Sequence, residues 1–570
     1  MTFDRWNELI QNYISEMSDT MNEAGVHTFS CCLIGQGSLP LQCAKILLGR
    51  GHLISCVMSP DPTVINWAFE NDIPCLDSVA ELVSHAARQP FDYLFSIVNY
   101  SILPKEVLEL PRCAAINFHD ALLPRYAGVY ATSWAIMNRE QSHGITWHKM
   151  SAGVDQGDIL KQQVVPIASR ETAFTLNTKC YFAAVRTFTQ LVTEISEDRV
   201  SAMKQDLSER TYFPKYKRPP SACLVSFQRD ATEIDAFIRA LNFGKYANPL
   251  GLPKIAGAKG FIVITESEVL DTTSGNTPGT IAQIDSNAIT VCTASQDIAL
   301  RNIQTIDGRP LEISAAAELI QMSAGDRFTP PAAEFSQRIT NLNTSICKHE
   351  AFWVERLTEL RPFAIPRANS TAVAAYEKAQ YASIPVMIPD PILALEKGSD
   401  CPLRGADLVL AAFAASLGHW ARVDEFDIGI RWPELDRDTF QLECLFAPAV
   451  PLHIRLSHFP SQESLNAVRR EVEVVKTRCT YARDVVTRYP SIRQTLGSAE
   501  NAYWHHNAPA VVIDLGTKSS EDLTLPGSKI TLAIPDALKS CRIIYDQTAL
   551  NEEAIGKTRD QLVASLSRIR

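Results

Sequence analysis

The sequence lacks an excess of positive charge. Lysine and arginine total 54 residues against 64 aspartates and glutamates, so the formal net charge at pH 7 is −10. A protein that binds many phosphates needs a surplus of Lys and Arg. The balance therefore argues against a large nucleic-acid partner, although it leaves room for a local basic patch.

Long apolar runs and a secretion signal are also missing. No segment approaches the roughly 18–20 uninterrupted apolar residues that a membrane-spanning helix needs. The N-terminal MTFDRWNELIQNY has no basic segment followed by an apolar run. The 14 cysteines stand singly except for Cys31 and Cys32, and none forms a C-x-x-C motif. We therefore expect a cytoplasmic protein with free thiols and no membrane partner.

The chain does contain enough apolar sequence for several hydrophobic cores. Its 570 residues are 46% hydrophobic and 21% charged, which is ordinary for globular proteins. A prior of roughly 150 residues per domain predicts three or four units. Residues 4–23 carry apolar side chains at three- and four-residue intervals, so we predict an amphipathic helix within 1–24. We interpret it as packing on the first domain, with docking of a partner as the alternative.

After this helix, the sequence predicts three domains. Apolar strands alternate with helical patterns over 25–211, which predicts an α/β domain with a Rossmann-like parallel sheet covered on both faces. A Pro- and Lys-rich break begins a second domain, 212–330, in which one helix at 232–243 leads into short strands and predicts a small β-barrel. Helices and strands mix over 331–570 and predict an α+β domain. The strands expected in the first domain read FSCCLIG, LISCVMS, DYLFSIV and CAAINFH.

Polar residues gather where the strand CAAINFH ends. Asn117 and His119 alternate along it and so share one face of the sheet. Ligands bind at the carboxyl edge of open α/β sheets. Asp155, in the turn-rich AGVDQGD, is placed to orient His119. Taken alone, the residue types fit a capped turn with buried polar contacts at least as well as a catalytic site.

A longer ordered pattern surrounds this cluster. It resembles the catalytic region of the 10-formyltetrahydrofolate-dependent formyltransferases, the family that contains the methionyl-tRNA, glycinamide-ribonucleotide and amino-sugar formyltransferases. The residues that carry the resemblance are Asn117, His119, Leu122, Leu123, Pro124, Tyr126, Gly128, Gly144, Thr146, His148, Asp155, Gly157 and Ile159.

The resemblance implies a catalytic trio of Asn117, His119 and Asp155, with 10-formyltetrahydrofolate as the formyl donor and without a metal. It also implies a folate pocket and an adjoining acceptor site. Trp134 fits either the acceptor site or the core. The residues implied for the folate are Tyr100, Ser101, Ile102, Leu103, Asp155 and Gly157, and those for the acceptor are Tyr126, Gly128, Val129 and Tyr130.

The residue types suit formyl transfer. The reaction passes through a tetrahedral intermediate, whose oxyanion needs a donor such as the Asn117 amide or a protonated His119. The attacking amine must also lose a proton, which an imidazole accepts near neutral pH. The chain departs from the common family pattern at Asp120-Ala121 and at Ala127, which leaves the acceptor open.

Two further motifs suggest other sites. Gly35 and Gly37, followed by Asp61, resemble a dinucleotide fingerprint, but Pro40 replaces the third glycine and we interpret the segment as an ordinary turn. His505-His506 has no neighbours at metal-ligand spacing, so we expect no metal there. His148 fits a satisfied strand residue as well as a site residue.

The later domains carry resemblances of their own. Residues 217–320 resemble the small C-terminal β-barrel domain of methionyl-tRNA formyltransferase, although the acidic chain argues against its nucleic-acid role. Segments from about residue 345 resemble the second half of a nonribosomal-peptide condensation domain, and the H-H-x-x-x-D-G motif of the first half is absent. This implies docking of a carrier protein or synthetase module. An unrelated α+β dimerisation domain is the alternative.

These observations predict an N-formyltransferase of natural-product biosynthesis. Its acceptor would be the amine of an amino acid, either free or bound to a carrier protein, in nonribosomal peptide synthesis. Two alternatives remain: an N-formyltransferase for amino-sugar nucleotides, and a non-catalytic adaptor that docks synthetase modules.

Overall fold

The structure is a computed structural model that describes residues 27–257, 260–366, 379–395, 405–456, 461–496, 509–516, 524–536 and 538–568. The predicted N-terminal helix and the pair His505-His506 lie outside these residues. The chain divides into two compact units. The first comprises Met1–Lys217 and Thr232–Gly244, and the second comprises Arg218–Ala231 and Lys245–Arg570. The domain boundaries expected from the sequence stay predictions.

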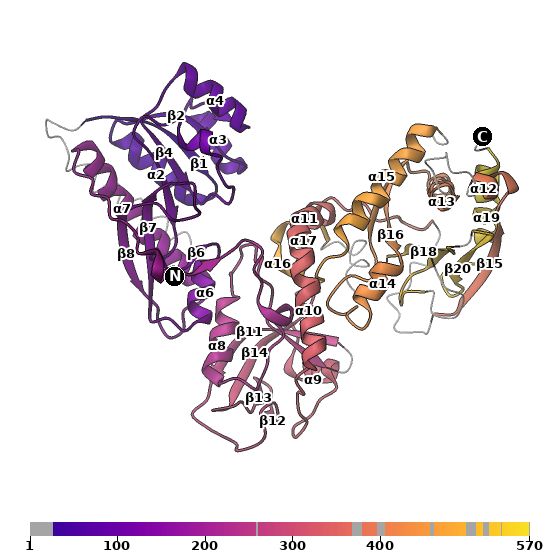
Figure 1. Cartoon of the computed structure of the whole chain (residues 1–570). Coiled ribbons are helices and arrows are strands. Elements are labelled where there is room, and N and C mark those ends of the chain that lie inside the picture. Colours follow the sequence, from indigo (N-terminus) through magenta and orange to yellow (C-terminus); the bar gives the residue numbers. More distant parts are fainter. Residues whose placement is uncertain are drawn as a thin grey trace. The chain divides into compact units, whose positions relative to one another are not determined.

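The first unit is built on a seven-stranded sheet in the order β3-β2-β1-β4-β5-β7-β8 (Figure 1). The five strands β1 to β5 run parallel, as predicted, whereas β7 and β8 run antiparallel to their neighbours. The prediction of a wholly parallel sheet is therefore wrong for these two strands. The loop 150–158 between them is shorter than the dozen or more residues that a parallel crossover needs. The strands are β1 Ser30–Gly35, β2 Leu53–Met58, β3 Cys75–Leu76, β4 Tyr93–Ile97, β5 Ala114–His119, β7 Ser142–Lys149 and β8 Ile159–Pro166.

Both faces of this sheet are buried. Along β1, Cys31 and Leu33 belong to one apolar cluster, and the alternate residues Cys32 and Ile34 belong to another on the opposite face. The first cluster includes the long helix α7, whose N-terminus is closed by a capping box at Thr172. The helices are α2 Ser38–Gly49, α3 Pro62–Glu70, α4 Val79–Arg88, α5 Lys105–Leu108, α6 Ala131–Met137, α7 Ala173–Ser196 and α8 Ala231–Ala240, with a short 3-10 turn at Leu207–Glu209.

Helix α8 packs with the first unit, although its sequence position suggested the start of the β-rich domain. Its small residues Ala236 and Ala240 lie in the same buried cluster as α7. Arg239 donates a hydrogen bond to the carbonyl oxygen of Glu171 at 2.6 Å. The packing of Ala236 and Ala240 and the hydrogen bond of Arg239 thus attach α8 to the first unit, which precedes it in the chain.

The second unit begins with a five-stranded antiparallel sheet in the order β10-β11-β14-β13-β12, against which α9 packs. Among the described residues no pairing joins β12 to β10, so the ladder is open where a barrel was predicted. A short strand pair in the first unit, β6 with β9, forms a separate ladder. The elements are β6 Ala127–Gly128, β9 Tyr212–Phe213, a 3-10 turn Pro220–Cys223, β10 Lys254–Gly257, β11 Gly260–Val269, β12 Ile281–Ile284, β13 Ile289–Val291, β14 Ile298–Thr305 and α9 Ile313–Ile320.

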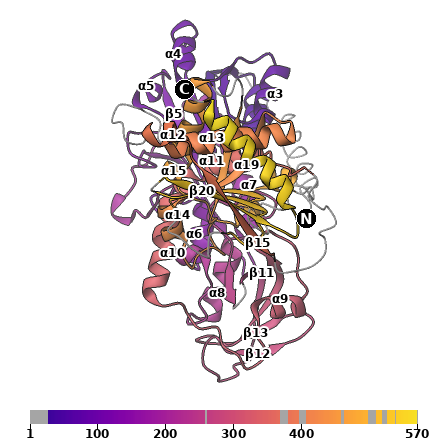
Figure 2. The ribbon, with the colours of Figure 1, turned by 90° about the vertical axis from the view of Figure 1, so that its right-hand side faces the viewer.

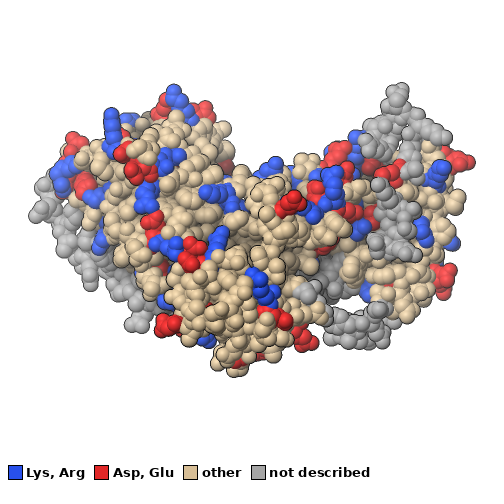
Figure 3. All heavy atoms as spheres, turned by 60° about the horizontal axis from the view of Figure 1, so that its bottom comes forward, with Lys and Arg blue, Asp and Glu red and all other residues tan. Residues whose placement is uncertain are grey.

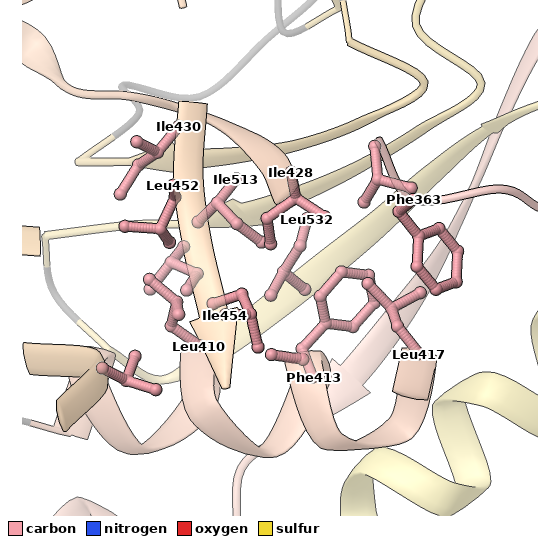
Figure 4. Close-up of a cluster of buried hydrophobic side chains, with 14 of the residues drawn as sticks. Phe363, Leu410, Phe413, Leu417, Ile428, Ile430, Leu452, Ile454, Ile513 and Leu532 are labelled. Atoms are coloured by element: carbon pink, nitrogen blue, oxygen red, sulfur yellow. The ribbon is translucent and has the colours of Figure 1, made fainter. Parts of the chain in front are cut away.

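A mixed six-stranded sheet forms the rest of the second unit, in the order β15-β20-β19-β18-β16-β17. Helix α19 lies across its strands beside α13 (Figure 2). Phe413 and Leu417 of α13 point into an apolar core with Ile428, Ile454 and Leu532 of the sheet (Figure 4). The elements are α10 Ala333–Ile346, a 3-10 turn Cys347–His349, α11 Glu350–Thr358, β15 Tyr381–Met387, α12 Asp390–Leu395, α13 Gly405–Ala421, β16 Glu425–Arg431, α14 Pro433–Thr439, β17 Val450–Arg455, α15 Gln462–Arg478, α16 Val485–Arg488, α17 Pro490–Leu496, β18 Val511–Leu515, β19 Ile530–Ile534, β20 Ser540–Asp546 and α19 Glu552–Ser567.

None of the helices in the described part of the chain has the length and apolarity to cross a membrane.

A buried ionic network joins the two parts of the second unit. Asp484 accepts from Lys254 Nζ at 2.5 Å and from Arg488 Nε at 2.8 Å. Arg488 also contacts both carboxylate oxygens of Glu350, at 3.0 and 2.6 Å. Burial raises the pKa of Asp484, but Arg488 and Lys254 outweigh it and hold that pKa well below its usual range. The charges are therefore stable inside the protein only as a set.

Replacing Arg488 should destabilise the second unit strongly, because the carboxylates of Glu350 and Asp484 both lose the cation that pairs with them. For Arg488→Met we expect the free energy of unfolding to fall by about 3–5 kcal/mol. The matched control is Arg301→Met, which breaks the exposed pair with Glu268 and should cost less than about 1 kcal/mol. Urea unfolding of the full chain measures both, and equal losses in the two variants would contradict the prediction.

Candidate active site

The candidate site lies at the carboxyl edge of the parallel strands, where β5 ends. Asn117 and His119 are two residues apart on β5 and point to the same side. The antiparallel neighbour β7 places His148 opposite Asn117 and Thr146 opposite His119. The site therefore receives side chains from two adjacent strands.

The ring of His119 is held in one orientation. Its Nε2 lies 2.8 Å from the carbonyl oxygen of Tyr126, which only accepts hydrogen bonds, so Nε2 carries the proton. The other nitrogen, Nδ1, lies 3.8 Å from Asp155 Oδ2. In the neutral ring Nδ1 is therefore the basic atom, and a proton gained there faces a carboxylate.

Asp155 closes the site from the loop between β7 and β8. Its Oδ2 accepts from the Gly128 N–H at 2.8 Å, and its Oδ1 lies 3.6 Å from His148 Nε2. Burial raises the pKa of the Asp155 carboxyl, but His119, His148 and the Gly128 amide outweigh it and hold that pKa well below its usual range. The carboxylate is consequently charged throughout the neutral and mildly acidic range.

The side-chain nitrogen of Asn117 is already occupied. Its Nδ2 donates to the Phe118 carbonyl oxygen at 2.9 Å and lies 3.2 Å from His148 Nε2. His148 Nδ1 donates to the Lys149 carbonyl oxygen at 2.8 Å, so its Nε2 is the acceptor for the amide. In the neutral ring His148 Nε2 therefore serves Asn117, and a protonated ring presents positive charge to Asp155 Oδ1 at 3.6 Å. Its place in the sequence pattern was the only signal for this residue.

The loop after β5 is fixed by residues of the pattern that follow it. Thr146 Oγ1 donates to the Ala121 carbonyl oxygen at 2.6 Å and accepts from the Leu123 N–H at 3.2 Å. The peptide bond between Leu123 and Pro124 is cis. A Cβ on Gly144 would lie only 2.5 Å from the Leu122 side chain, so glycine makes room for the loop. These positions shape the backbone around His119.

Of the residues implied for the acceptor, Tyr126 is engaged inside the protein. Its ring is 5% exposed and stacks on Phe213 at 5.4 Å between centroids, and its hydroxyl donates to Glu140 at 2.7 Å. Gly128 gives its N–H to Asp155. Val129 and Tyr130, in contrast, are half-buried at the start of α6.

Trp134 belongs to the packed side of this loop. The indole is buried and stacks on Phe213 at 4.9 Å. This placement favours the core interpretation of Trp134 over a direct role in the acceptor site.

The residues implied for the folate lie in the loop that follows β4. Asn99 and Ser101 close a tight turn, with Ser101 N–H donating to Asn99 Oδ1 at 3.0 Å. Tyr100 is 48% exposed and Ile102 is 85% exposed, whereas Leu103 is buried. The exposed Ile102 side chain, next to the edge of the sheet, offers apolar contact area to an aromatic ligand.

Gly157, also implied for the folate, is a packing position in this structure. A Cβ there would lie 1.8 Å from the Lys149 carbonyl oxygen. The backbone of the Asp155 loop therefore approaches β7 more closely than any other residue would allow.

The structure argues against a dinucleotide site at Gly35 and Gly37. Asp61 Oδ2 accepts from the Gly37 N–H at 2.8 Å, and Oδ1 accepts from the Thr63 N–H at 2.8 Å. A carboxylate of the chain thus occupies the place at the start of α2 where a pyrophosphate would bind. Across the described ranges, no three His, Cys, Asp or Glu side chains are grouped as a metal site requires.

Comparison with known proteins places this site in a family. Residues 79–192 match the formyl transferase model, and residues 218–319 match the formyl transferase C-terminal domain. Methionyl-tRNA formyltransferase of Clostridium novyi (strain NT) is 30% identical over 270 residues, which cover 46% of this chain and 83% of the relative. The chain belongs to the formyl transferase family. The family resemblance seen in the sequence is confirmed, while the likeness of 331–570 to condensation domains stays a prediction.

A second relative and two solved structures are also similar to part of this chain. Methionyl-tRNA formyltransferase of Legionella pneumophila (strain Philadelphia 1) is 27% identical over 286 residues, covering 47% of this chain and 88% of the relative. The solved N-formyltransferase from Helicobacter canadensis, in complex with folinic acid and dTDP-3-aminofucose, is 21% identical with a TM-score of 0.40, covering 48% of this chain and 98% of that one. HypX from Aquifex aeolicus, in complex with tetrahydrofolic acid, is 15% identical with a TM-score of 0.38, covering 54% and 50%.

The lowered pKa of Asp155 predicts how the stability of the protein depends on pH. Because its pKa is lower in the folded protein than in the unfolded chain, the charged form stabilises the fold above the unfolded pKa of about 3.9. This stabilisation disappears as the pH falls through the lower, folded pKa. Asp155→Asn should therefore unfold more easily than the wild type at pH 6, and the difference should shrink as the pH is lowered below about 4. Urea unfolding at a series of pH values measures it, and a difference that grows in acid would contradict it.

Proposed function

We propose that this protein transfers a formyl group from 10-formyltetrahydrofolate to an amine. The observation that carries the proposal is the arrangement of His119, whose basic Nδ1 faces the charged Asp155 at the carboxyl edge of the sheet. The curated relatives of this chain are named methionyl-tRNA formyltransferases. A base held next to a fixed negative charge is what the transfer of a proton from an amine requires.

The exposed loop after β4 suits the folate. Ile102 and Tyr100 present apolar surface to a planar ring, and the turn at Asn99 and Ser101 supplies backbone polar groups nearby. When bound, 10-formyltetrahydrofolate supplies an activated formyl carbon. The residues of the chain then have to orient the amine, move its proton and stabilise the oxyanion.

His119 moves the proton. As the amine nitrogen bonds to the formyl carbon, Nδ1 accepts one of its protons, and Asp155 stabilises the imidazolium at 3.8 Å. The protonated ring stabilises the oxyanion of the tetrahedral intermediate. When the bond between the carbon and the folate nitrogen breaks, Nδ1 returns the proton to that nitrogen, so the ring ends as it began.

Asn117 orients the amine. Its Nδ2 is committed to Phe118 and His148, which leaves Oδ1 as the acceptor that turns toward an N–H of the incoming amine. Of the two oxyanion donors expected from the sequence, the protonated His119 is therefore the one that the geometry favours.

We infer that the acceptor is an aminoacyl amine, free or bound to a carrier protein, in nonribosomal peptide synthesis. Residues 331–570 contain an apolar core of their own. Their sequence resembles half of a condensation domain. On the face drawn in Figure 3, Lys and Arg side chains alternate with Asp and Glu, and the chain has a net charge of −10. Mixed and net negative charge disfavours tRNA as the acceptor.

Removing the base should abolish most of the transfer. We expect His119→Asn to lower kcat by about 10²–10⁴-fold, the contribution typical of a general base. The matched control is His27→Asn, an exposed histidine that precedes β1 at the opposite edge of the sheet, and it should retain the wild-type rate. Transfer of a labelled formyl group from 10-formyltetrahydrofolate measures both, and an undiminished rate in His119→Asn would exclude the assigned role.

A panel of acceptors tests the substrate class. The full chain is incubated with labelled 10-formyltetrahydrofolate and, separately, with free amino acids, an aminoacyl carrier protein, a dTDP-amino sugar and methionyl-tRNA. We expect label on the amino acid or aminoacyl carrier only. Label on the sugar nucleotide alone would replace this proposal by the amino-sugar function. No binding of any folate would favour the adaptor.

A further inference from the structure

A segment just before the end of the first unit ties the two catalytic loops together. We call residues 203–213 the strap. It starts at Met203, which pairs with Ile159 of β8 through two backbone hydrogen bonds of 2.7 and 2.8 Å, and it ends in the short strand β9. Its last two residues, 212 and 213, fall in the Pro- and Lys-rich break that the sequence suggested as the start of the second domain.

The strap orients the backbone beside His119. The N–H groups of Ala127 and Val129 donate to the carbonyl oxygens of Thr211 and Phe213 at 2.9 and 3.0 Å. Successive amides of an extended chain point to opposite sides, so pairing at 127 and 129 turns the Gly128 N–H away from the strap. There it meets Asp155 Oδ2 at 2.8 Å.

The pairing depends on glycine at position 128. Its φ is 104°, and a Cβ there would lie 2.0 Å from the Phe213 carbonyl oxygen. Any larger residue would separate the strap from the loop.

The strap also holds the backbone of the Asp155 loop by side-chain hydrogen bonds. Gln205 Nε2 donates to the carbonyl oxygens of Asp155 and Gly157, at 2.9 and 2.6 Å, and Arg210 Nη2 donates to that of Val154 at 3.1 Å. Asp155 has a φ of 54°, a left-handed conformation that aspartate tolerates better than most non-glycine residues but that still needs support from its surroundings.

The Gln205 amide is oriented by these two donated bonds alone. Its Oε1 is buried and has no hydrogen-bond partner among the described residues. A buried oxygen without a partner is energetically unfavourable. The two hydrogen bonds that the Gln205 amide nitrogen donates offset this cost.

We propose that Gln205 is a positioning residue for formyl transfer: by donating to the carbonyl oxygen of Asp155 itself and to that of Gly157, it fixes the backbone of this loop and so holds the Asp155 carboxylate toward His119 and Gly128. The inference rests on the proposed function and deepens it, because it assigns the strap to the same site. The hydrogen bonds of the Gln205 side chain go to the backbone of the Asp155 loop, so Gln205 acts through Asp155.

The test is an almost isosteric change that removes the donors. In Gln205→Glu two carboxylate oxygens replace the amide, and they repel the carbonyls of Asp155 and Gly157. We expect kcat to fall by about 10- to 100-fold, the effect of a displacement of about 1 Å, with the KM for 10-formyltetrahydrofolate changed less than about 2-fold. The control is Gln228→Glu, an exposed glutamine of the second unit whose amide donates to the Pro278 carbonyl oxygen at 3.1 Å. It should keep wild-type kinetics.

A second readout needs no turnover. In protein labelled with ¹³C at the Asp carboxyl groups, NMR follows the titration of Asp155, which in the wild type lies below the usual range. In Gln205→Glu and in Gln205→Met, which keeps the length without polar atoms, we expect the Asp155 titration to rise toward about 3.9 as the carboxylate leaves Gly128 and His119. A change in general stability alone would not move it.

The outcomes separate the two proposals. If the wild type transfers formyl groups and both Gln205 variants keep its kcat and its Asp155 titration, the positioning role is wrong and the proposed function stands. If the wild type transfers none, the proposed function is wrong, and the Asp155 titration in the variants alone decides whether Gln205 positions the carboxylate.

Discussion

Asp155 holds a negative charge inside the protein, and most of the candidate site is organised around it. A buried carboxylate is costly unless hydrogen bonds and positive charge compensate for the lost water. Here a backbone amide provides a hydrogen bond, and the rings of His119 and His148 provide positive charge when they are protonated. Each of these partners is in turn held by another group: His119 by the Tyr126 carbonyl, His148 by the Lys149 carbonyl, and Gly128 by its pairing with the strap.

The second unit follows the same physical rule with a different result. Asp484 is buried among two cations, and they hold its pKa well below the usual range. Asp514, near the end of β18, lies 3.0 Å from Arg431, and burial, together with the charge of Asp436, raises its pKa to about 7. The number and geometry of the partners, rather than burial alone, thus decide whether a carboxyl in this protein is charged at neutral pH.

Much of the fold was predictable from local pattern. The parallel strands β1, β2, β4 and β5 lie where the apolar runs of the sequence placed them, and α8 is a helix as predicted. The antiparallel direction of β7 and β8 was not predictable, because strand direction depends on which neighbour a strand pairs with. Helix α8 shows the same limit: its own sequence specifies a helix, and only its contacts assign it to the first unit.

By itself, the sequence determined which chemical groups are present, their order along the chain and the family to which they belong. Asn117, His119 and Asp155 were named from that order, and their roles stay proposals. Only the tertiary structure decided how the groups act on one another. It committed the Asn117 amide to His148, turned the Tyr126 ring inward, and brought Gln205 to the backbone of Asp155, 50 residues earlier in the chain. Contacts at such separations depend on how the sheet and its loops pack, which spacing along the chain does not encode.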